Sequence, residues 1–459
     1  MWSEDNTQNL KWHFIGVGGC GMSGLAKVLL ERGFAVSGSD MTASEKTSSL
    51  TRQGARVFIG HDRNHLEEDV SVVVVSTAIH PDNPEWEEAI RRGLTVLHRS
   101  QCLAWLTESQ KTIAVAGAHG KTTTTSMLAA VLIGAGWDPT VVVGGSMNIL
   151  DGNGRWGRGT FLVAEADESD GSFLNLKTYM PVITNIEDDH LEHYGSMKEI
   201  EDSFLRFVRQ SDPEGVSVIC TDCPRALALS RMVDRPVTYG LNPQARFQAV
   251  DLRVEDGMNT ADVLEQGRPA GTIRTYMPGV HNIQNALGAY ACARTLGLDP
   301  RSAFRGLQAY EGVGRRFQRI GEHQGVTVVD DYAHHPTEIG ALLDGARSLG
   351  PDRIVAVFQP HRYTRTRQFL QAFADILQKA DLTLVSDVYS AGEEPISGAD
   401  APSLVGRSTG RVLQYTGDLE QTLDILSGLV RPGDLVLTVG AGDVTTLGPK
   451  LLERLSVHD

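Results

Sequence analysis

A short apolar run at residues 112–116 leads directly into a glycine-containing loop, and a helical stretch at residues 123–133 follows. The loop consists of Gly117, Ala118, His119, Gly120, Lys121, Thr122 and Thr123. A buried strand that passes through a glycine loop into a helix is the first half of a βαβ unit, and such units build mainly parallel sheets covered by helices. This feature predicts an α/β fold.

The same loop predicts a phosphate-binding site. Its backbone N–H groups and the helix N-terminus point at phosphate oxygens, while Lys121 reaches the β and γ phosphates of ATP and the Thr122 hydroxyl ligates Mg²⁺. Val115 stands where the pattern G-x-x-x-x-G-K-[ST] has its first glycine, so a chance glycine turn beside a lysine is the alternative. Because an exposed loop lysine contributes little to a core, we expect Lys121→Ala to reduce activity without changing the melting temperature.

A second glycine loop lies near the N-terminus. Gly16, Gly18 and Gly21 follow an apolar run, and Asp40 lies at the end of the next predicted strand. This arrangement is typical of a dinucleotide-binding fingerprint, in which the acid binds a ribose, but the same geometry holds any nucleotide diphosphate. A tight turn with a purely structural role is the alternative. Two nucleotide sites on one chain indicate two different nucleotides.

Carboxylates and imidazoles follow two later predicted strands. The run at residues 161–164 delivers Glu165, a candidate metal ligand, to the carboxyl end of the sheet, where α/β proteins bind ligands. The strand at residues 181–184 is followed by an acidic segment that contains His190, whose expected place beside the γ-phosphate favours a function. The acidic residues after Glu165 are Asp167, Glu168 and Asp170. That acidic run is either part of the site or merely solvated.

Basic residues gather in the last third of the chain. The predicted strand at residues 354–358 is followed by His361, Arg362 and Arg365. On a helical turn the two arginines can face the same way and bind a carboxylate bidentately. A solvated helix start is the alternative.

The length of 459 residues exceeds what one hydrophobic core usually supports. We predict a Rossmann-like domain at residues 1–109, a central P-loop ATPase-type parallel-sheet domain at 110–317 and a C-terminal Rossmann-like α/β domain at 318–459. Residues 244–278 read as a β-meander, and the glycines and arginines at 312–316 read as a hinge.

The composition restricts partners and compartment. Asp and Glu number 57 against 42 for Lys and Arg, and this net charge of −15 opposes binding to nucleic acid or to an anionic membrane. The five scattered cysteines suit a reducing compartment, and Cys220 and Cys223 form only a lone C-x-x-C. With no signal peptide and no long apolar run, we expect a cytoplasmic protein without a membrane span.

Seven motifs together resemble those of the Mur ligases along nearly the whole chain. They are the loop at 117–123, the segments that begin at Glu165 and Thr184, His281 to Asn285, Gly314 to Phe317, Asp331 to Pro336, and His361 to Arg365. Within that family, the glycine-rich opening at residues 16–24 and the two histidine clusters are most similar to the members that join L-alanine to UDP-N-acetylmuramate in peptidoglycan synthesis.

The resemblance implies a reaction and its cofactors. ATP phosphorylates the lactyl carboxylate of UDP-N-acetylmuramate, and the amine of L-alanine attacks the acyl phosphate, which gives ADP, phosphate and an amide. The expected cofactor is Mg²⁺, for which Mn²⁺ is expected to substitute. Lys121 would steady the transferred phosphoryl group, Thr122 and Glu165 would hold one metal ion, and His190 would hold a second.

The resemblance also assigns the binding residues. The adenine would be bordered by His281, Asn282 and Asn285, while Arg316 would contact phosphate and Asp331 the ATP ribose. The UDP-sugar site would comprise Gly16, Gly18, Gly19, Cys20, Gly21, Asp40, Ser76 and Thr77. The amino acid would be held by Tyr332, His361, Arg362 and Arg365. Residues 1–109 are expected to bind the sugar nucleotide without ATP, and the enzyme is expected to be a monomer or homodimer.

Other functions remain open at this point. The nearest is a related ligase that recycles murein peptides by adding a whole peptide. An NAD-dependent oxidoreductase with an accessory P-loop domain rests only on the first glycine loop and Asp40, and a nucleotide-switched binding module would be a protein without catalysis. The sequence does not decide between L-alanine, glycine and L-serine as the amine.

Overall fold

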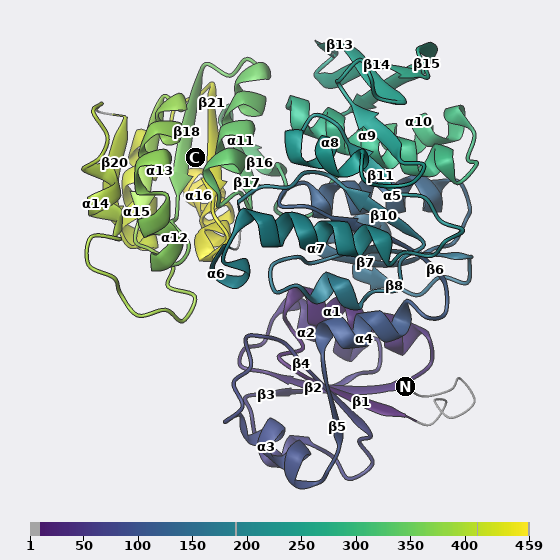
Figure 1. Cartoon of the computed structure of the whole chain (residues 1–459). Helices are drawn as coiled ribbons and strands as arrows, with labels where there is room; N and C mark the ends of the chain where they lie inside the picture. The colour runs from purple at the N-terminus through teal and green to yellow at the C-terminus, as the bar shows by residue number, and fades with distance from the viewer. Residues whose placement is uncertain (1–9, 189–190, 411, 458–459) are drawn as a thin grey trace. The chain divides into compact units, whose positions relative to one another are not determined.

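The computed structural model describes residues 10–188, 191–410 and 412–457, in which three β-sheets are covered by helices (Figure 1). The chain divides into two compact units. One comprises Met1–Asp251, Ala261–Ile273 and Gln284–Glu311, and the other comprises Leu252–Thr260, Arg274–Ile283 and Gly312–Asp459. In this part of the chain no helix is both long and apolar enough to cross a membrane.

The first sheet has five strands in the order β3-β2-β1-β4-β5, and all its neighbours are parallel. Its strands are β1 (Lys11–Ile15), β2 (Ala35–Asp40), β3 (Arg56–Ile59), β4 (Val72–Val75) and β5 (Thr95–His98). Its helices are α1 (Cys20–Glu31), α2 (Glu45–Arg52), the short η2 (Arg63–His65), α3 (Pro84–Arg91) and α4 (Arg99–Leu106). Because β1 pairs with both β2 and β4, the loops that follow these three strands meet at one edge of the sheet.

The two faces of this sheet are covered by different helices. Side chains of α1 and α4 pack with Trp12 and Phe14 on one face, whereas Ala89 of α3 packs with Ile15 and Val73 on the other. The first of these cores also includes Val142, Leu162 and Ala164 of the next sheet. One of the two cores of the first sheet therefore continues into the second predicted domain.

The second sheet has ten strands in the order β15-β14-β13-β12-β11-β10-β6-β9-β7-β8. Its strands are β6 (Lys111–Ala116), β7 (Thr140–Met147), β8 (Gly152–Arg155), β9 (Phe161–Glu165), β10 (Met180–Ile183), β11 (Val218–Cys220), β12 (Val237–Gly240), β13 (Phe247–Glu255), β14 (Met258–Glu265) and β15 (Arg268–Thr275). Its helices are α5 (Lys121–Gly134), η3 (Asn148–Leu150), η4 (Ser172–Asn175), α6 (Leu191–Tyr194), α7 (Met197–Arg209), α8 (Pro224–Ser230), α9 (Val280–Thr295) and α10 (Pro300–Gln308).

The strand before the phosphate loop lies in the middle of this sheet. β6 pairs in parallel with β10 on one side and with β9 on the other. The loop after β6 therefore lies between the carboxyl ends of two neighbours, which carry Glu165 and Thr184. The predicted meander at residues 244–278 is confirmed as the successive strands β13, β14 and β15.

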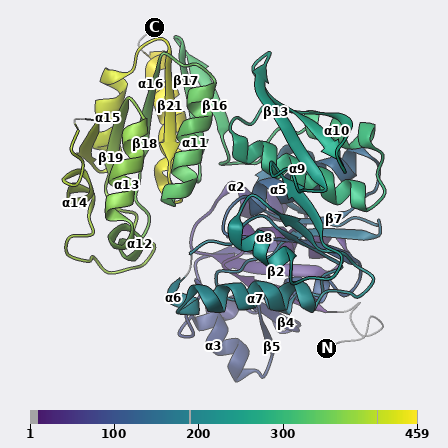
Figure 2. The ribbon, with the colours of Figure 1, turned by 45° about the horizontal axis from the view of Figure 1, so that its top comes forward.

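The third sheet has six strands in the order β16-β17-β21-β18-β19-β20. Its strands are β16 (Gln318–His323), β17 (Val326–Asp331), β18 (Arg353–Phe358), β19 (Leu382–Ser386), β20 (Leu413–Gly417) and β21 (Asp434–Val439). Its helices are α11 (Pro336–Ser348), α12 (Tyr363–Gln368), α13 (Leu370–Ile376), η5 (Leu377–Lys379), α14 (Ala401–Val405), α15 (Leu419–Leu429), η6 (Asp443–Thr446) and α16 (Leu447–Val457). Helices α11, α13 and α14 pack on one face and α15 and α16 on the other (Figure 2).

The prediction of an α/β fold with three domains is confirmed, since each of the three sheets is largely parallel and covered by helices. The exact boundaries at residues 109 and 317 stay predictions. All five cysteines are free, and burial raises the pKa of the Cys220 thiol to about 12.

Candidate functional site

The phosphate loop is shaped by two glycines with positive φ. Gly117 has φ of 141° and Gly120, the N-cap of α5, has φ of 82°. A Cβ at Gly117 would collide with the Thr184 hydroxyl, and a Cβ at Gly120 would collide with the Asn285 amide oxygen. The loop is therefore packed so closely that only glycine fits at these two positions.

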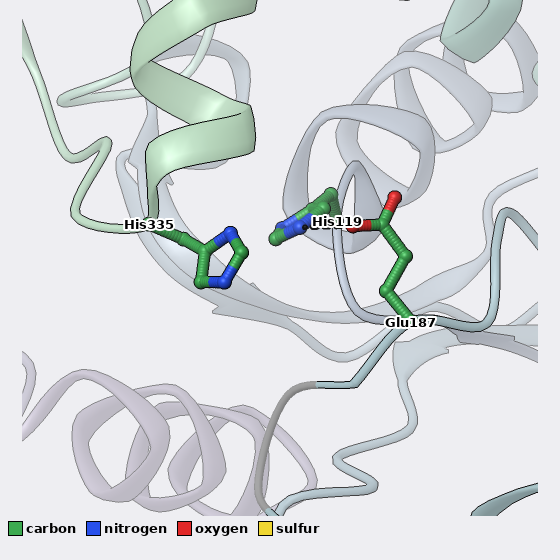
Figure 3. Close-up of side chains that lie close together, drawn as sticks. All are labelled: His119, Glu187 and His335. Atoms are coloured by element: carbon green, nitrogen blue, oxygen red, sulfur yellow. Dashed lines mark ion pairs between the residues drawn. The ribbon is translucent and has the colours of Figure 1, made fainter. Parts of the chain in front are cut away.

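The end of β10 fixes the middle of the loop. The His119 N–H donates to Asn185 Oδ1 at 2.9 Å, and the His119 carbonyl accepts hydrogen bonds from the Thr184 hydroxyl at 2.6 Å and from Asn185 Nδ2 at 3.0 Å. The His119 imidazole forms an ion pair with Glu187 at 3.3 Å when it is protonated (Figure 3). The conformation of the loop is thus fixed by hydrogen bonds to its neighbours.

Lys121 begins α5, and its ammonium group turns back into the loop. Its Nζ donates to the Gly117 carbonyl at 2.6 Å, to the Ala118 carbonyl at 3.4 Å and to Glu168 Oε1 at 2.6 Å. Burial alone would lower the pKa of Lys121, but the carboxylates of Glu168, Asp167 and Glu165 outweigh this effect and raise the pKa. Lys121 is therefore a charged group that is only 17% exposed, and the expectation of an exposed loop lysine is wrong.

The acidic run after Glu165 is folded into the site. Glu168 is 4% exposed, and Asp167 forms an ion pair with Arg99. Burial would raise the pKa of Asp167, but Arg99 and Lys121 hold it well below its usual range. The alternative of a merely solvated acidic run is wrong for these two residues, because both carboxylates face cations at the carboxyl end of the sheet.

Two oxygen ligands suit a magnesium ion at this edge. The Thr122 hydroxyl lies in the first turn of α5, and Glu165 ends β9, where its Oε1 accepts a hydrogen bond from the Gly144 N–H at 2.6 Å. Carboxylate and hydroxyl oxygens are the hard ligands that Mg²⁺ prefers, so these residues fit the ion. His190, the expected ligand of a second ion, lies outside the described residues.

The three residues expected at the adenine are in the first turns of α9. Asn285 is buried, and its Oδ1 accepts a hydrogen bond from the Thr124 hydroxyl at 3.2 Å. Asn282 donates to the Pro278 carbonyl at 2.8 Å. His281 lines a pocket of about 450 Å³ with Val254, and burial lowers the pKa of this imidazole to about 4.

The N-terminal glycine loop is held by the acid that was expected to bind ribose. Asp40 Oδ2 accepts a hydrogen bond from the Gly18 N–H at 2.8 Å. Gly16 has φ of 80°, and Gly19 is the N-cap of α1, whose N-terminus has no side-chain cap. The first turn of α1, which contains Cys20 and Gly21, therefore offers backbone N–H groups to an anion.

Two further segments border this loop. Ser76 and Thr77 directly follow β4, beside β1, and a Cβ at Gly16 would lie 3.1 Å from Ile79 of the same segment. The Lys46 ammonium lies 2.9 Å from the Cys20 thiol. The expected sugar-nucleotide residues thus lie at one edge of the first sheet.

In the third sheet, Asp331 ends β17. Its carboxylate accepts backbone hydrogen bonds from the Phe317 N–H at 2.7 Å and from the Ala333 N–H at 2.8 Å. Burial raises the pKa of Asp331 to about 6, although the Arg316 guanidinium opposes this shift. The Arg316 guanidinium lies 5.2 Å from the centre of the Tyr332 ring. Asp331 and Arg316, which were assigned separately from sequence, are close neighbours.

The predicted amino-acid residues cluster around His361. The Arg365 guanidinium lies 3.3 Å from His361 Nδ1, and the His361 ring stacks on Tyr389 with centroids 5.5 Å apart. The His334 ring lies 6.2 Å from the His361 ring and 5.2 Å from the Tyr332 ring. Tyr332, His361 and Arg365 are therefore brought together from the ends of two strands.

Both imidazoles of this cluster are neutral at physiological pH. Burial, the neighbouring His334 and nearby arginines lower the pKa of His361 to about 3. Burial is also the main cause that lowers the pKa of His334 to about 4, against the Glu338 carboxylate. The guanidinium of Arg365 is therefore a cation beside two uncharged rings.

Arg362 differs from the sequence-based expectation. It is the N-cap of α12 with φ of 70° and ψ of 138°, so it precedes the helix and does not share a helical turn with Arg365. The prediction that Arg362 and Arg365 share a helical turn is wrong, because the chain turns between β18 and α12 and Arg362 lies in that turn. Its N–H donates to the Tyr389 carbonyl at 2.8 Å. A positive φ at a non-glycine residue is typical of functional loops.

Sequence reasoning missed two neighbours of these sites and the contact made by a third. Arg99 follows β5 and pairs with Asp167, and Tyr389 follows β19 and supports His361. Both come just after a parallel strand, so the rule that found Glu165 applies to them as well. Glu168 was noticed only as one of several acids, and only the fold shows that it meets Lys121.

A phosphate loop with adjoining carboxylates, a second glycine loop on another parallel sheet and a cationic cluster on a third define a nucleotide-binding α/β enzyme. The chain matches the Mur ligase family catalytic domain over residues 11–111, the Mur ligase middle domain over 115–293 and the Mur ligase glutamate ligase domain over 315–442. A relative from Pelotomaculum thermopropionicum, named UDP-N-acetylmuramate–L-alanine ligase, is 46% identical over 96% of this chain and 97% of its own length. The chain belongs to the Mur ligase family.

Two solved structures are similar along nearly the whole chain. A UDP-N-acetylmuramate-alanine ligase from Thermotoga maritima has a TM-score of 0.84 and 31% identity, covering 98% of this chain and 100% of its own. A murein peptide ligase from Psychrobacter arcticus has a TM-score of 0.73 and 24% identity, covering 97% and 98%. The second likeness concerns the fold alone. The prediction of a Mur ligase is confirmed.

Proposed function

We propose that this Mur ligase joins L-alanine to the lactyl carboxylate of UDP-N-acetylmuramate, with ATP converted to ADP and phosphate, in peptidoglycan synthesis. The observation that carries the proposal is the phosphate loop with Lys121, flanked by Glu165 and Glu168, in a chain whose full-length relatives bear the name of this reaction. Neither the oxidoreductase nor the recycling ligase is favoured by the relatives.

The first step is phosphoryl transfer. A lactyl carboxylate oxygen attacks the γ-phosphorus of ATP, the bond to the β-phosphate oxygen breaks, and ADP leaves. The loop N–H groups and Lys121 hold the phosphate oxygens, because this chemistry depends mainly on positioning and charge neutralisation. Thr122 and Glu165 would hold Mg²⁺, which supplies further neutralisation of the phosphate charge when it is bound.

The second step forms the amide. The uncharged amine of L-alanine attacks the acyl carbon, phosphate leaves and the amine loses a proton. A free amino acid presents a carboxylate, and the Arg365 guanidinium with the neutral His361 offers it a cation and a ring N–H. Because burial, helped by the neighbouring arginines, holds His361 neutral, and His334 is neutral as well, the cluster presents no imidazolium to repel the substrate ammonium.

Phosphate release against a panel of amines tests the proposal. We expect turnover only when UDP-N-acetylmuramate, ATP and an amine are all present, with L-alanine preferred over glycine and L-serine. Preference for a murein peptide would identify a recycling ligase, and ATP turnover without either cosubstrate would identify a nucleotide-driven module. Stabilisation by NAD but not by the sugar nucleotide would reopen the oxidoreductase.

A further inference from the structure

All three N–H donors of the Lys121 ammonium face acceptors of the protein itself. An ammonium group carries three N–H donors, and those of Lys121 face the carbonyls of Gly117 and Ala118 and the carboxylate of Glu168. A phosphate oxygen must therefore replace one of these acceptors. The two carbonyls belong to the loop that cradles the phosphate, so Glu168, an anion like the incoming phosphate, is the replaceable partner.

The backbone of Glu168 is fixed by two hydrogen bonds, and its side chain is buried. Its carbonyl accepts hydrogen bonds from the Gly171 N–H at 3.0 Å and from the Tyr194 hydroxyl. Its side chain is 5% exposed, and among the described residues its Oε2 has no hydrogen-bond partner. A buried carboxylate that loses its cation carries a high free-energy cost. The pair with Lys121 therefore opposes nucleotide binding.

We propose that Glu168 is a positioning residue, the counter-ion of Lys121 in the phosphate loop, which the nucleotide phosphates displace from Lys121 and which recaptures Lys121 as ADP leaves. This role rests on the proposed function. No bond is made or broken, since only the partner of the ammonium changes. Glu168 thereby keeps the Lys121 ammonium aimed into the loop between turnovers, and it limits how tightly ADP is retained.

Glu168→Gln tests this role, because it removes the charge and keeps the shape. We expect the variant to bind ADP about tenfold more tightly in calorimetry on the full chain, which corresponds to about 1.4 kcal/mol. The KM for ATP should fall, while the KM values for the sugar nucleotide and the amino acid should not change. A merely structural defect would raise the KM for ATP.

Asp170→Asn is the matched control. Asp170 lies in the same acidic segment, and its Oδ1 accepts a hydrogen bond from the Ser172 N–H at 2.9 Å. This variant also removes one negative charge, and we expect its ADP affinity to stay within about twofold of the wild type. If Asp170→Asn tightened ADP binding as much as Glu168→Gln, the effect would be one of general charge and the proposal would be overturned.

Two further variants complete the test. In a Lys121→Ala background, Glu168→Gln should have little effect on ADP binding, because the residue acts through Lys121. Glu168→Asp shortens the side chain by one methylene and moves the carboxylate away from Lys121, so it should tighten ADP binding less than Glu168→Gln does. It replaces Glu168→Gln as the test if that variant does not fold. A wild-type chain that binds no ADP would refute the proposed function itself. A wild-type chain that binds ADP, with Glu168→Gln binding it equally or more weakly, would overturn only this inference.

Discussion

At the scale of the residue, the closest charged pair of the phosphate loop is Lys121 with Glu168. Lys121 was expected to be an exposed residue whose removal leaves stability unchanged, but both partners are largely buried. Its removal would leave the Glu168 carboxylate without its cation. Catalysis and stability are therefore coupled at this position.

Lys121→Ala is expected to lower activity by at least about 100-fold, since the charge on the β and γ phosphates is lost. It should also destabilise the fold by roughly 3 kcal/mol, because an unpaired buried carboxylate remains. Thermal unfolding measures the second effect. The double variant Lys121→Ala with Glu168→Gln should regain most of the stability but none of the activity. Near-normal turnover of the single variant would contradict the phosphate-loop assignment.

Arg365 belongs to the same scale. Arg365→Lys keeps the positive charge but loses the planar donors that bind a carboxylate at two points, and Lys does not replace them well. We expect catalytic efficiency for L-alanine to fall roughly 30-fold to 1000-fold, equivalent to about 2 to 4 kcal/mol. Steady-state kinetics should show the change in the KM for L-alanine. A raised KM for ATP would instead show that the cluster binds the phosphates of ATP and not the carboxylate of the amino acid.

At the scale of the element, the turn from β1 to α1 is set by steric contact. A Cβ at Gly18 would lie 2.9 Å from Asp40 Oδ2, whereas a Cβ at Gly21 would meet only Arg99, at 3.5 Å. The first distance is shorter than ordinary packing permits, and the second is a normal contact. A side chain at Gly18 would therefore clash with Asp40, whereas a methyl group at Gly21 would fit.

Gly18→Ala should therefore displace the Asp40 carboxylate and weaken binding of UDP-N-acetylmuramate about tenfold, or about 1.4 kcal/mol. Gly21→Ala is the control and should bind the sugar nucleotide nearly as the wild type does. Calorimetry without ATP on the full chain distinguishes them. Equal affinities for all three proteins would mean that this loop does not bind the substrate.

The strands and helices of the third sheet carry two histidines with depressed pKa values. His334 and His361 have pKa values of about 4 and 3 in the folded chain, against about 6.5 when unfolded. Between pH 6.5 and 4 the unfolded state therefore binds more protons at these two histidines, which lowers stability as the pH falls. Asp331, whose pKa burial raises to about 6, offsets part of this loss, because the folded state binds the Asp331 proton first. Each histidine contributes a slope of up to about 1.4 kcal/mol per pH unit.

We expect amide exchange in β17, β18 and α11 to accelerate as the pH falls through this window, after correction for intrinsic exchange rates. His334→Gln should reduce the slope. All six tryptophans precede residue 160, as the sequence shows, so tryptophan fluorescence reports on the other compact unit and serves as the internal comparison. If the corrected amide exchange rates in β17 and α11 did not depend on pH, the neutral state of these imidazoles would be contradicted.

At the scale of the whole molecule, one of the two cores of the first predicted domain is completed by residues of the second, while the other core lies wholly within the first domain. Val142, Leu162 and Ala164 complete the core of α1 and α4, and the Lys27 ammonium donates to the Leu150 carbonyl at 2.6 Å. That residues 1–109 bind the sugar nucleotide by themselves stays a prediction, and the shared core leads us to expect that stable binding requires a longer fragment.

Residues 1–109 alone should expose this apolar face and unfold or aggregate, whereas a fragment of residues 1–317 retains its partners and should stay folded. Circular dichroism and size-exclusion chromatography of the two fragments measure the difference. A stable, monomeric 1–109 fragment with a cooperative melting transition would show that the shared core is dispensable.

The sequence determined the fold class and the location of the chemistry. Apolar strands that end in glycines, acids or histidines are local patterns, and the parallel sheet requires that all such ends meet at one edge. Gly117, Lys121 and Glu165 were therefore found without coordinates, although their assigned roles stay predictions. Only the tertiary structure decided which of these side chains touch. The pairing of Glu168 with Lys121, of Arg99 with Asp167 and of Tyr389 with His361 depends on strand order and register, which join residues far apart in the chain. The conformation of Arg362 was decided in the same way, because the reversal after β18 overrides helical spacing.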